Sequence, residues 1–286
     1  PSVRRGVLAA HRAQDLADSL GRPLDASRAA RLKAELFRRR GQLDEATQAL
    51  LEAEDRLEAG AHAVARGWCR QVAGWLYLDR GRHQDARDAF SAAGPLCAEG
   101  GDEGGVQWAL LGEAHVELAL GHATLARRLG KATELAFDQL DAARGGLAAR
   151  FLRAAAAAAA GDAVTAARRY AGLQALADDR GWWVEAVTLR LRRAEQALAM
   201  SRPHDADRLL EEAGGLSQIL GLGAVCAWVK AVRPPVLAAA GDGPRAREAL
   251  AQAVLPAPAL AAAASAAAHA ALALPGARLD PDLHAV

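Results

Sequence analysis

The sequence has little of several residues that most soluble proteins use freely. It contains no asparagine, one isoleucine, one methionine and three lysines among its 35 basic residues, and only 4% of its residues are aromatic. Such a bias toward arginine, alanine and leucine is typical of a GC-rich coding sequence. We therefore expect a bacterial protein. The 52% of hydrophobic residues excludes an intrinsically disordered chain.

A surplus of charge of one sign is also absent. The 35 basic and 34 acidic residues leave a formal net charge of +1. Proteins that bind nucleic acid or an anionic membrane through their overall field carry a large positive surplus. We therefore expect no nucleic-acid partner and no membrane partner, and any charged partner must be recognised by a local patch.

The motifs of metal, redox and nucleotide chemistry are missing as well. Cys69, Cys97 and Cys226 are odd in number and far apart, so they form neither a disulfide framework nor a CxxC motif. The eight histidines show no HExxH motif, no serine lies in GxSxG, and no glycine-rich loop carries a phosphate-binding lysine. We expect no metal, no cofactor, no catalytic residue and no enzymatic activity, and we expect a reducing, cytoplasmic compartment.

One long stretch, residues 253–276, carries no formal charge. It is long enough to cross a bilayer, but it is mostly alanine, and Pro256 and Pro258 lie near its start. We expect a terminal capping helix and tail over 253–286 in place of a membrane span. The sequence starts at Pro1 without a basic and apolar leader, which is compatible with a piece of a longer polypeptide.

Glycine and alanine recur with a fixed spacing of 40 residues. A Gly-x4-Ala motif occurs five times with this spacing, at Gly41/Ala46, Gly81/Ala86, Gly121/Ala126, Gly161/Ala166 and Gly241/Ala246. A sixth position in the same series has Ser201 in place of the glycine, followed by Ala206. Each glycine separates two helical patterns, which predicts the left-handed turn of a helical hairpin. The alanine falls on the first turns of the second helix, where a small side chain lets the two helices pack closely.

The second copy resembles the tetratricopeptide repeat family. It has the small and aromatic residues of that repeat in the same order and spacing, namely Gly74, Tyr77, Gly81, Ala86, Phe90 and Ala93. The family repeat is about 34 residues long, so the extra residues here predict longer helices. Heat-type repeats also have periods near 40 residues, but they do not predict these small residues around the turn.

The resemblance implies an all-α protein, a right-handed α-solenoid of antiparallel helix hairpins with about 12 to 14 helices. We expect a single superhelical array over 1–286, with repeat turns near 41, 81, 121, 161, 201 and 241. The expected helices are 3–20, 25–40, 43–59, 61–80, 83–98, 105–120, 122–140, 145–160, 162–180, 182–200, 203–219, 223–240, 244–254 and 258–273.

Two places violate the helical pattern. Gly94-Pro95 interrupts an expected helix, and the glycines between 100 and 105 predict a loose connection with a hinge or bend. Pro234-Pro235 falls inside the helix expected over 223–240, and we expect a kink or a break there.

In tetratricopeptide arrays the first helix of each hairpin lines the concave face. We assigned the positions that face the concave side to each 40-residue copy in turn. The residues at these positions are rich in arginine and tryptophan, the side chains most often found at binding hot spots, and they are our partner-binding candidates. They are Arg28, Arg31, Arg38, Arg39, Trp68, Gln71, Trp75, Trp108, His115, Phe151 and Trp228, with Glu35, Asp79 and Glu195 in the same register. The alternative is that the tryptophans only pack between hairpins. Of the pair Trp182-Trp183, we expect at most one to be fully buried.

The sequence therefore predicts a scaffold or adaptor that binds a protein or peptide in its concave groove. Residues 1–40 contain ten basic and four acidic residues, so Arg28, Arg31, Arg38 and Arg39 are expected to form a basic lip for an acidic segment or a chain-terminal carboxylate. A solvated basic face is the alternative interpretation.

Two further hypotheses stay open. Long arginine- and alanine-rich repeats with a helix opening at Gly181-Trp182-Trp183 resemble the arrays of bacterial CHAT-domain and STAND multidomain proteins, which implies a sensor or regulatory arm. The uncharged segment 253–276 at the end of the array instead indicates a self-assembling scaffold, because an apolar terminal repeat can pack against another copy. Such a scaffold would be a homo-oligomer formed through the terminal hairpins.

Overall fold

The computed structural model describes residues 3–57 and 62–252, and within these ranges the chain forms thirteen α-helices and no strand. The helices are α1 (Val3–Ser19), α2 (Pro23–Arg39), α3 (Leu43–Asp55), α4 (Ala63–Asp79), α5 (His83–Glu99), α6 (Glu103–Ala119), α7 (Ala123–Gln139), α8 (Ala143–Ala159), α9 (Ala163–Asp179), α10 (Trp183–Ala199), α11 (Pro203–Leu220), α12 (Gly223–Ala239) and α13 (Gly243–Gln252). The predicted all-α solenoid is confirmed. The expected helix 258–273 and the terminal cap over 253–286 lie outside the described residues.

Helix and turn together repeat every 20 residues, half the period that the sequence suggests. Ten of the described helices are 17 residues long. Nearly every turn between two helices contains one residue with a positive φ, and these residues lie on a series with a step of 20 along the chain. They are Gly21, Gly41, Gly81, Gly101, Gly121, Asp141, Gly161, Gly181, Ser201, Gly221 and Gly241. The predicted hairpin turns are every second member of this series.

The turn at Gly41 shows why a left-handed residue is needed. The Gly41 amide donates to the carbonyl of Arg38 at 2.9 Å, and the Gln42 amide donates to the carbonyl of Phe37 at 3.0 Å. This pair of bonds satisfies the last carbonyls of α2 and requires φ near +77° at Gly41, which glycine adopts at little cost. The alanine five residues later, Ala46, is fully buried, as are its equivalents Ala86, Ala126, Ala166 and Ala206.

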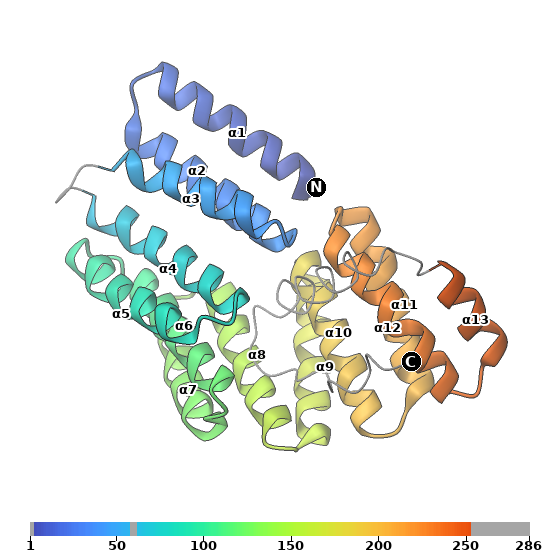
Figure 1. The fold of residues 1–286 in the computed structure, drawn as a ribbon. Coiled ribbons are helices and arrows are strands. Elements are labelled where there is room, and N and C mark those ends of the chain that lie inside the picture. Colours follow the sequence, from blue (N-terminus) through green and yellow to red (C-terminus); the bar gives the residue numbers. More distant parts are fainter. Residues whose placement is uncertain (1–2, 58–61, 253–286) are drawn as a thin grey trace.

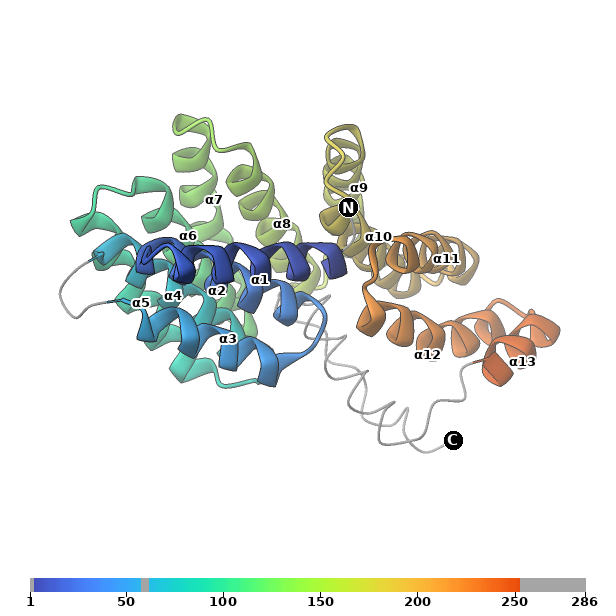
Figure 2. The same cartoon turned by 90° about the horizontal axis from the view of Figure 1, so that it is seen from above.

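Consecutive helices pack as antiparallel neighbours and coil into a curved array (Figure 1). The start of α1 approaches the α10 region, as both views show (Figures 1 and 2). Val3 of α1 belongs to the same buried cluster as Val187 and Leu191 of α10, and Leu36 of α2 packs against this cluster. Helices α1 to α10 therefore curve into a ring, and α11 to α13 continue beyond it.

The expected interruption at Gly94-Pro95 is wrong. Helix α5 runs through Pro95 to Glu99, because the residue before the proline is a glycine and has no Cβ to clash with the proline ring. The following connection is also tight and not loose. Gly101 has φ of +74°, and the Asp102 carboxylate accepts a hydrogen bond from the Gly105 amide at 2.8 Å, which caps α6.

Of the kink or break expected at Pro234-Pro235, the break is wrong, since α12 is one helix from Gly223 to Ala239. Its side chains Val229, Val236 and Leu237 are buried, and tertiary packing of this kind holds a helix whose sequence is locally unfavourable. Within the ranges that the structure describes, no helix has both the length and the apolar character needed to cross a membrane.

Candidate functional site

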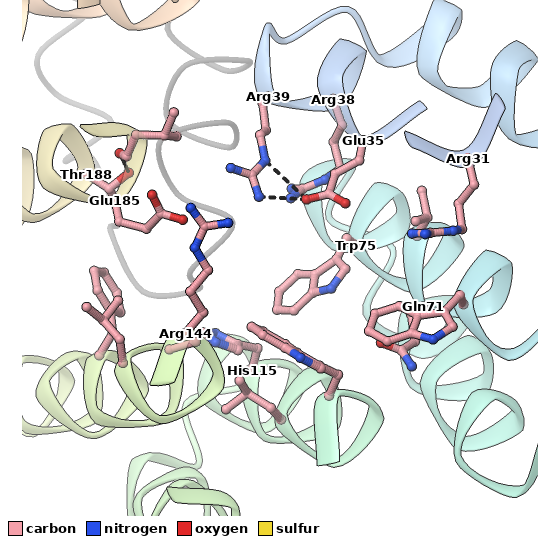
Figure 3. A pocket seen from close by; sticks show the side chains of 18 residues that line it. Arg31, Glu35, Arg38, Arg39, Gln71, Trp75, His115, Arg144, Glu185 and Thr188 are labelled. Atoms are coloured by element: carbon pink, nitrogen blue, oxygen red, sulfur yellow. Dashed lines mark hydrogen bonds and ion pairs between the residues drawn. The ribbon is translucent and has the colours of Figure 1, made fainter. Parts of the chain in front are cut away.

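Five helices surround one cavity of about 390 Å³ on the inner side of the ring (Figure 3). All 18 residues that line it come from α2, α4, α6, α8 and α10, the first helices of successive hairpins. The lining residues of α2 lie in its second half, whereas those of α10 lie in its first turns. The cavity therefore crosses the helices obliquely.

Most of the residues selected from the sequence meet at this cavity. Those that line it are Arg31, Arg38, Arg39, Trp68, Gln71, Trp75, Trp108, His115 and Phe151. Arg28 lies instead beside a neighbouring cavity of about 400 Å³, which shares Arg31 and Trp68 with the first. The two cavities therefore meet at this arginine and tryptophan.

Trp228 does not face the cavity. It is buried in α12, in the cluster that contains Val225, Val229 and residues of α10 and α11. The predicted register does not place Trp228 at the cavity because the ring closes at α10. The corresponding face of α12 is therefore buried against α10 and α11. Glu195 is also outside the lining and pairs with Arg192 at 2.8 Å. Of the tryptophan pair, Trp182 packs against the core and Trp183 is exposed, as expected.

The tryptophans of the cavity are held by contacts behind them. Trp75 meets Phe90 and His115 edge-on at centroid distances of 5.2 and 5.1 Å. The indole nitrogen of Trp68 donates to the Asp102 carboxylate at 2.7 Å. These rings pack between hairpins and also line the cavity, so both interpretations of the sequence apply to them. Their fixed positions reduce the side-chain entropy that a ligand must immobilise.

A buried ion pair supports the wall behind Trp75. The Arg38 guanidinium donates to the Asp79 carboxylate at 3.0 Å, and both side chains are buried. Burial raises the pKa of Asp79 to about 6, although Arg38 opposes this rise. The guanidinium also lies over the Trp75 ring at 5.7 Å. Arg38 is thus occupied inside the protein and is not part of an open basic lip.

Arg39 is occupied as well, because it donates twice to Glu35, at 2.6 and 3.2 Å (Figure 3). Burial acts to raise the pKa of Glu35, but Arg39 and Arg38 outweigh it and hold that pKa well below its usual range. Glu185 of α10 adds to the field that raises the pKa of Arg39. The start of α10 therefore interacts electrostatically with the end of α2.

Two guanidiniums at the cavity have no carboxylate partner within 4 Å among the residues that the structure places. Arg31 lies over the ring of Trp68 at 5.4 Å, and Arg144 lies over the ring of Trp182 at 5.4 Å. Figure 3 shows them on different walls, with Arg144 pointing into the open space. They are the positive charges that remain for a ligand.

His115 provides a polar group at the base of the cavity. It is only 2% exposed, and its Nδ1 has no hydrogen-bond partner among the described residues. Burial lowers the pKa of His115 to about 3, and Arg192 contributes to the shift. The ring is therefore neutral at physiological pH, and its Nδ1 is a buried polar atom left without a partner within the described ranges.

No family model matches the sequence, and no curated protein matches it. Solved structures do match. A Rap protein complexed with competence and sporulation factor superposes with a TM-score of 0.64 at 12% identity, over 92% of this chain and 77% of that chain. A tetratricopeptide repeat protein from Parabacteroides merdae has a TM-score of 0.50 at 16% identity, over 92% and 99% of the two chains. Aspartyl phosphate phosphatase F from Bacillus subtilis has a TM-score of 0.55 at 14% identity, over 87% and 67%.

The fold is of the tetratricopeptide type. In this tetratricopeptide-type ring, sequence reasoning missed eight cavity residues, which are Val72, Leu111, Arg144, Leu147, Ala148, Val184, Glu185 and Thr188. The signal was present, because Ala148 and Thr188 continue the 40-residue series of Arg28, Trp68 and Trp108. At these two positions it was passed over because alanine and threonine do not stand out as arginine and tryptophan do.

Proposed function

We propose that this protein is a scaffold or adaptor that binds a segment of a protein or peptide partner in the cavity between α2, α4, α6, α8 and α10. The observation that carries the proposal is the combination of fixed tryptophans with two guanidiniums, those of Arg31 and Arg144, that lack an internal carboxylate. Aromatic and arginine side chains dominate the energetics of protein recognition.

The size and chemistry of the cavity favour a peptide segment. A volume of about 390 Å³ lies within the range of ligand sites, and the neighbouring cavity beyond Trp68 extends the groove in one direction. Trp75, Trp108 and Phe151 offer apolar surface for a side chain. Arg31 and Arg144 suit a carboxylate, from an acidic residue or a chain end. A Rap protein with a similar fold is complexed with competence and sporulation factor, which supports a groove of this type as a binding site.

Binding and not catalysis is the proposed role. The ionisable groups of the cavity are mostly engaged in pairs that fix the walls, such as Arg38 with Asp79 and Arg39 with Glu35. We propose that the protein works in the bacterial cytoplasm. A role as the regulatory arm of a larger signalling or CHAT peptidase-type protein stays a prediction, and in that case ligand binding in the groove is its input.

Selection from a random peptide library tests the proposal. The library is displayed with free carboxyl ends and selected on the full chain. We expect enriched peptides to combine an aromatic or large apolar residue with an acidic residue or with a recognised terminal carboxylate. Binding of a synthesised winner is then measured by its effect on tryptophan fluorescence.

The matched variants are Arg31→Glu with Arg144→Glu in the groove, and Arg128→Glu on the exposed face of α7 as the control. All carry a charge reversal, and neither groove arginine holds an internal ion pair. We expect the groove variant to weaken binding at least tenfold and the control to leave it unchanged. Equal binding by both variants would remove the groove as the site.

One observation favours self-association as a second candidate function. Leu8, Leu16 and Leu20 are each at least half exposed on or next to α1, the first helix of the array. Exposed apolar residues on a terminal repeat are a common contact surface between copies. Light scattering of the parent chain and of Leu16→Glu tests this, and a monomeric parent chain at high concentration would exclude it.

A further inference from the structure

A second cavity, of about 290 Å³, lies away from the groove between α7, α8 and α9. Its lining is unusually basic, with Arg150 and Arg153 from α8 and Arg168 and Arg169 from α9. Figure 1 shows these three helices side by side in the middle of the array. The peptide-binding proposal makes no use of this site.

Two of the four guanidiniums are fixed by carboxylates. Arg150 donates from Nε to Glu134 at 2.9 Å and from Nη2 to both oxygens of Asp138, at 2.9 and 3.0 Å. Arg153 donates from Nη1 to the other oxygen of Glu134. Both oxygens of Glu134 are therefore in use. Arg153 still has a buried Nε without any hydrogen-bond partner in the described part of the chain.

The other two guanidiniums have no carboxylate partner. Arg169 donates only to the main-chain carbonyl of Arg153, at 3.2 Å, and Arg168 makes no hydrogen bond or ion pair with any described residue. Asp162, which caps α9, forms no ion pair with either of them. Four guanidiniums against the two carboxylates of Glu134 and Asp138 leave two positive charges at this cavity.

The next hairpin shows what fills the equivalent place. Forty residues further along, Arg190 and Arg208 occupy the positions of Arg150 and Arg168. There the Glu212 carboxylate bridges them, with one oxygen 3.2 Å from Nε of Arg190 and the other 3.1 Å from Nη1 of Arg208. This carboxylate is an internal anion held between the two arginines.

At the second cavity the residue equivalent to Glu212 is Gly172. A Cβ atom placed on Gly172 would meet no other atom within 4 Å, so the space beside it is open. Both arginines are retained, but they are paired differently here. Arg150 is paired with Glu134, whose equivalent in the next hairpin is Gln174. Arg168 has no carboxylate, because Gly172 replaces the glutamate. An anion from outside the protein can occupy the open space beside Gly172, because the Arg168 and Arg169 guanidiniums have no internal carboxylate and guanidiniums bind oxyanions strongly.

We propose that this cavity binds a phosphate monoester, whose oxygens occupy the open space beside Gly172 and accept hydrogen bonds from Arg168 and Arg169, the two arginines without a carboxylate. A phosphate monoester is a dianion, which matches the two positive charges left over. It also has three terminal oxygens for guanidinium donors, where a carboxylate has two. The cavity is at the small end of the range for ligand sites, so it suits one phosphate group with a small attachment.

Calorimetry on the full 286-residue chain tests the proposal. The probes are phenyl phosphate and inorganic phosphate, with phenyl sulfate as a monoanionic control, all at equal ionic strength. We expect saturable binding of phenyl phosphate with one site per chain and at least tenfold weaker binding of phenyl sulfate. Similar affinities for the two phosphates would show that the phosphate group alone is recognised. Tighter binding of the ester would point to a ligand with an organic group. Both outcomes support the site.

The decisive variant is Gly172→Glu, which restores the carboxylate of the next hairpin. We expect it to weaken phenyl phosphate binding at least tenfold and to raise the melting temperature in the absence of ligand, whereas Gly172→Ala keeps binding within twofold. Arg168→Gln is the second variant, and it should weaken binding while leaving the melting temperature unchanged because Arg168 holds no internal pair. Absence of saturable binding by the parent chain, or unchanged binding by Gly172→Glu and Arg168→Gln, would overturn the proposal.

Discussion

Arg38 of α2 and Asp79 of α4 form an ion pair between neighbouring hairpins, with 3.0 Å between Nη1 and Oδ2 and with the second carboxylate oxygen unpaired. Their side chains are 8% and 1% exposed. The pair thus joins two helices that line the groove in a place where water does not solvate it.

Removing one partner of this pair should be far more harmful than removing both. Arg38→Met leaves the Asp79 carboxylate buried without a counter-ion, and we expect the free energy of unfolding to fall by about 3 to 5 kcal/mol. Arg38→Met with Asp79→Leu replaces both charges with apolar groups and should recover most of that loss. Urea denaturation followed by circular dichroism measures both variants. A double variant as unstable as the single one would contradict the expectation.

Asp79 also predicts a dependence of stability on pH. Its pKa in the folded protein is about 6, above the ordinary value of 3.8, so the folded state binds the proton more tightly than the unfolded state. Protonation of Asp79 therefore contributes to the free energy of unfolding at low pH. This contribution is complete below about pH 4 and is lost as the pH rises through 6. We expect the unfolding free energy of the parent chain, relative to Asp79→Asn, to be larger at pH 4.5 than at pH 7 by about 1 to 3 kcal/mol.

Glu35 does not obscure this window. Its pKa is lowered, so its contribution is complete above the ordinary value of 4.5 and declines only below that pH. If the parent chain instead gained stability relative to Asp79→Asn as the pH rose from 4.5 to 7, the pKa of Asp79 would be depressed by Arg38 and not raised by burial.

The contact between Phe90 and Gly112 leaves no room for an additional side-chain atom. The Phe90 ring, fully buried on α5, lies 2.3 Å from the position that a Cβ atom would take on Gly112 of α6. We expect Gly112→Ala to lower the free energy of unfolding by about 1 to 3 kcal/mol through overpacking. Phe90→Leu in the same chain should relieve part of this loss.

The matched control is Gly215→Ala, at a helical position of α11 where a Cβ atom meets nothing within 4 Å. Because alanine is the better helix former, this change should raise stability by about 0.5 to 1 kcal/mol. Thermal melts of the two variants compare them directly, and a stabilised Gly112→Ala would show that α5 and α6 can separate freely.

The thiols should react in the order of their exposure. Burial raises the pKa of Cys69 to about 11 and also raises the pKa of Cys97, so little thiolate is present on either at pH 8. Cys226 is only partly buried. With a thiol reagent at pH 8, we expect Cys226 to react first and the other two to react at the rate of unfolding. Mass spectrometry of the labelled peptides assigns each site, and early labelling of Cys69 would contradict the described packing of α4.

The fold could be predicted because its constraints are local. The turn at Gly41 needs a left-handed residue, and the space beside Ala46 needs a small one, so both leave a periodic trace in the sequence. The helix continuity at Pro95 could not be predicted from the proline alone. It depends on the preceding glycine and on packing between hairpins, which outweigh the intrinsic penalty of proline.

The candidate cavity was predictable only in part, because its outline depends on the curvature of the array. Trp68 and Trp108 share a register and do line the cavity, whereas Trp228 shares the same register and is buried in the core. No local pattern states after how many hairpins the ring closes. The pairing of Arg38 with Asp79 was likewise invisible, since arginine and aspartate 41 residues apart meet only through the stacking of hairpins.

The meeting of α1 with α10 also bears on how the molecule loses its structure. In an open array each repeat contacts only its neighbours, so the ends fray first and unfolding spreads along the chain. Here Val3 lies in the same buried cluster as Val187 and Leu191, which connects the first described helix to the tenth. Because α2 and α10 both line the cavity and Leu36 of α2 packs against this cluster, a ligand that contacts both helices would stabilise this connection. Fraying would then be suppressed at the first helix, although the ligand never touches it.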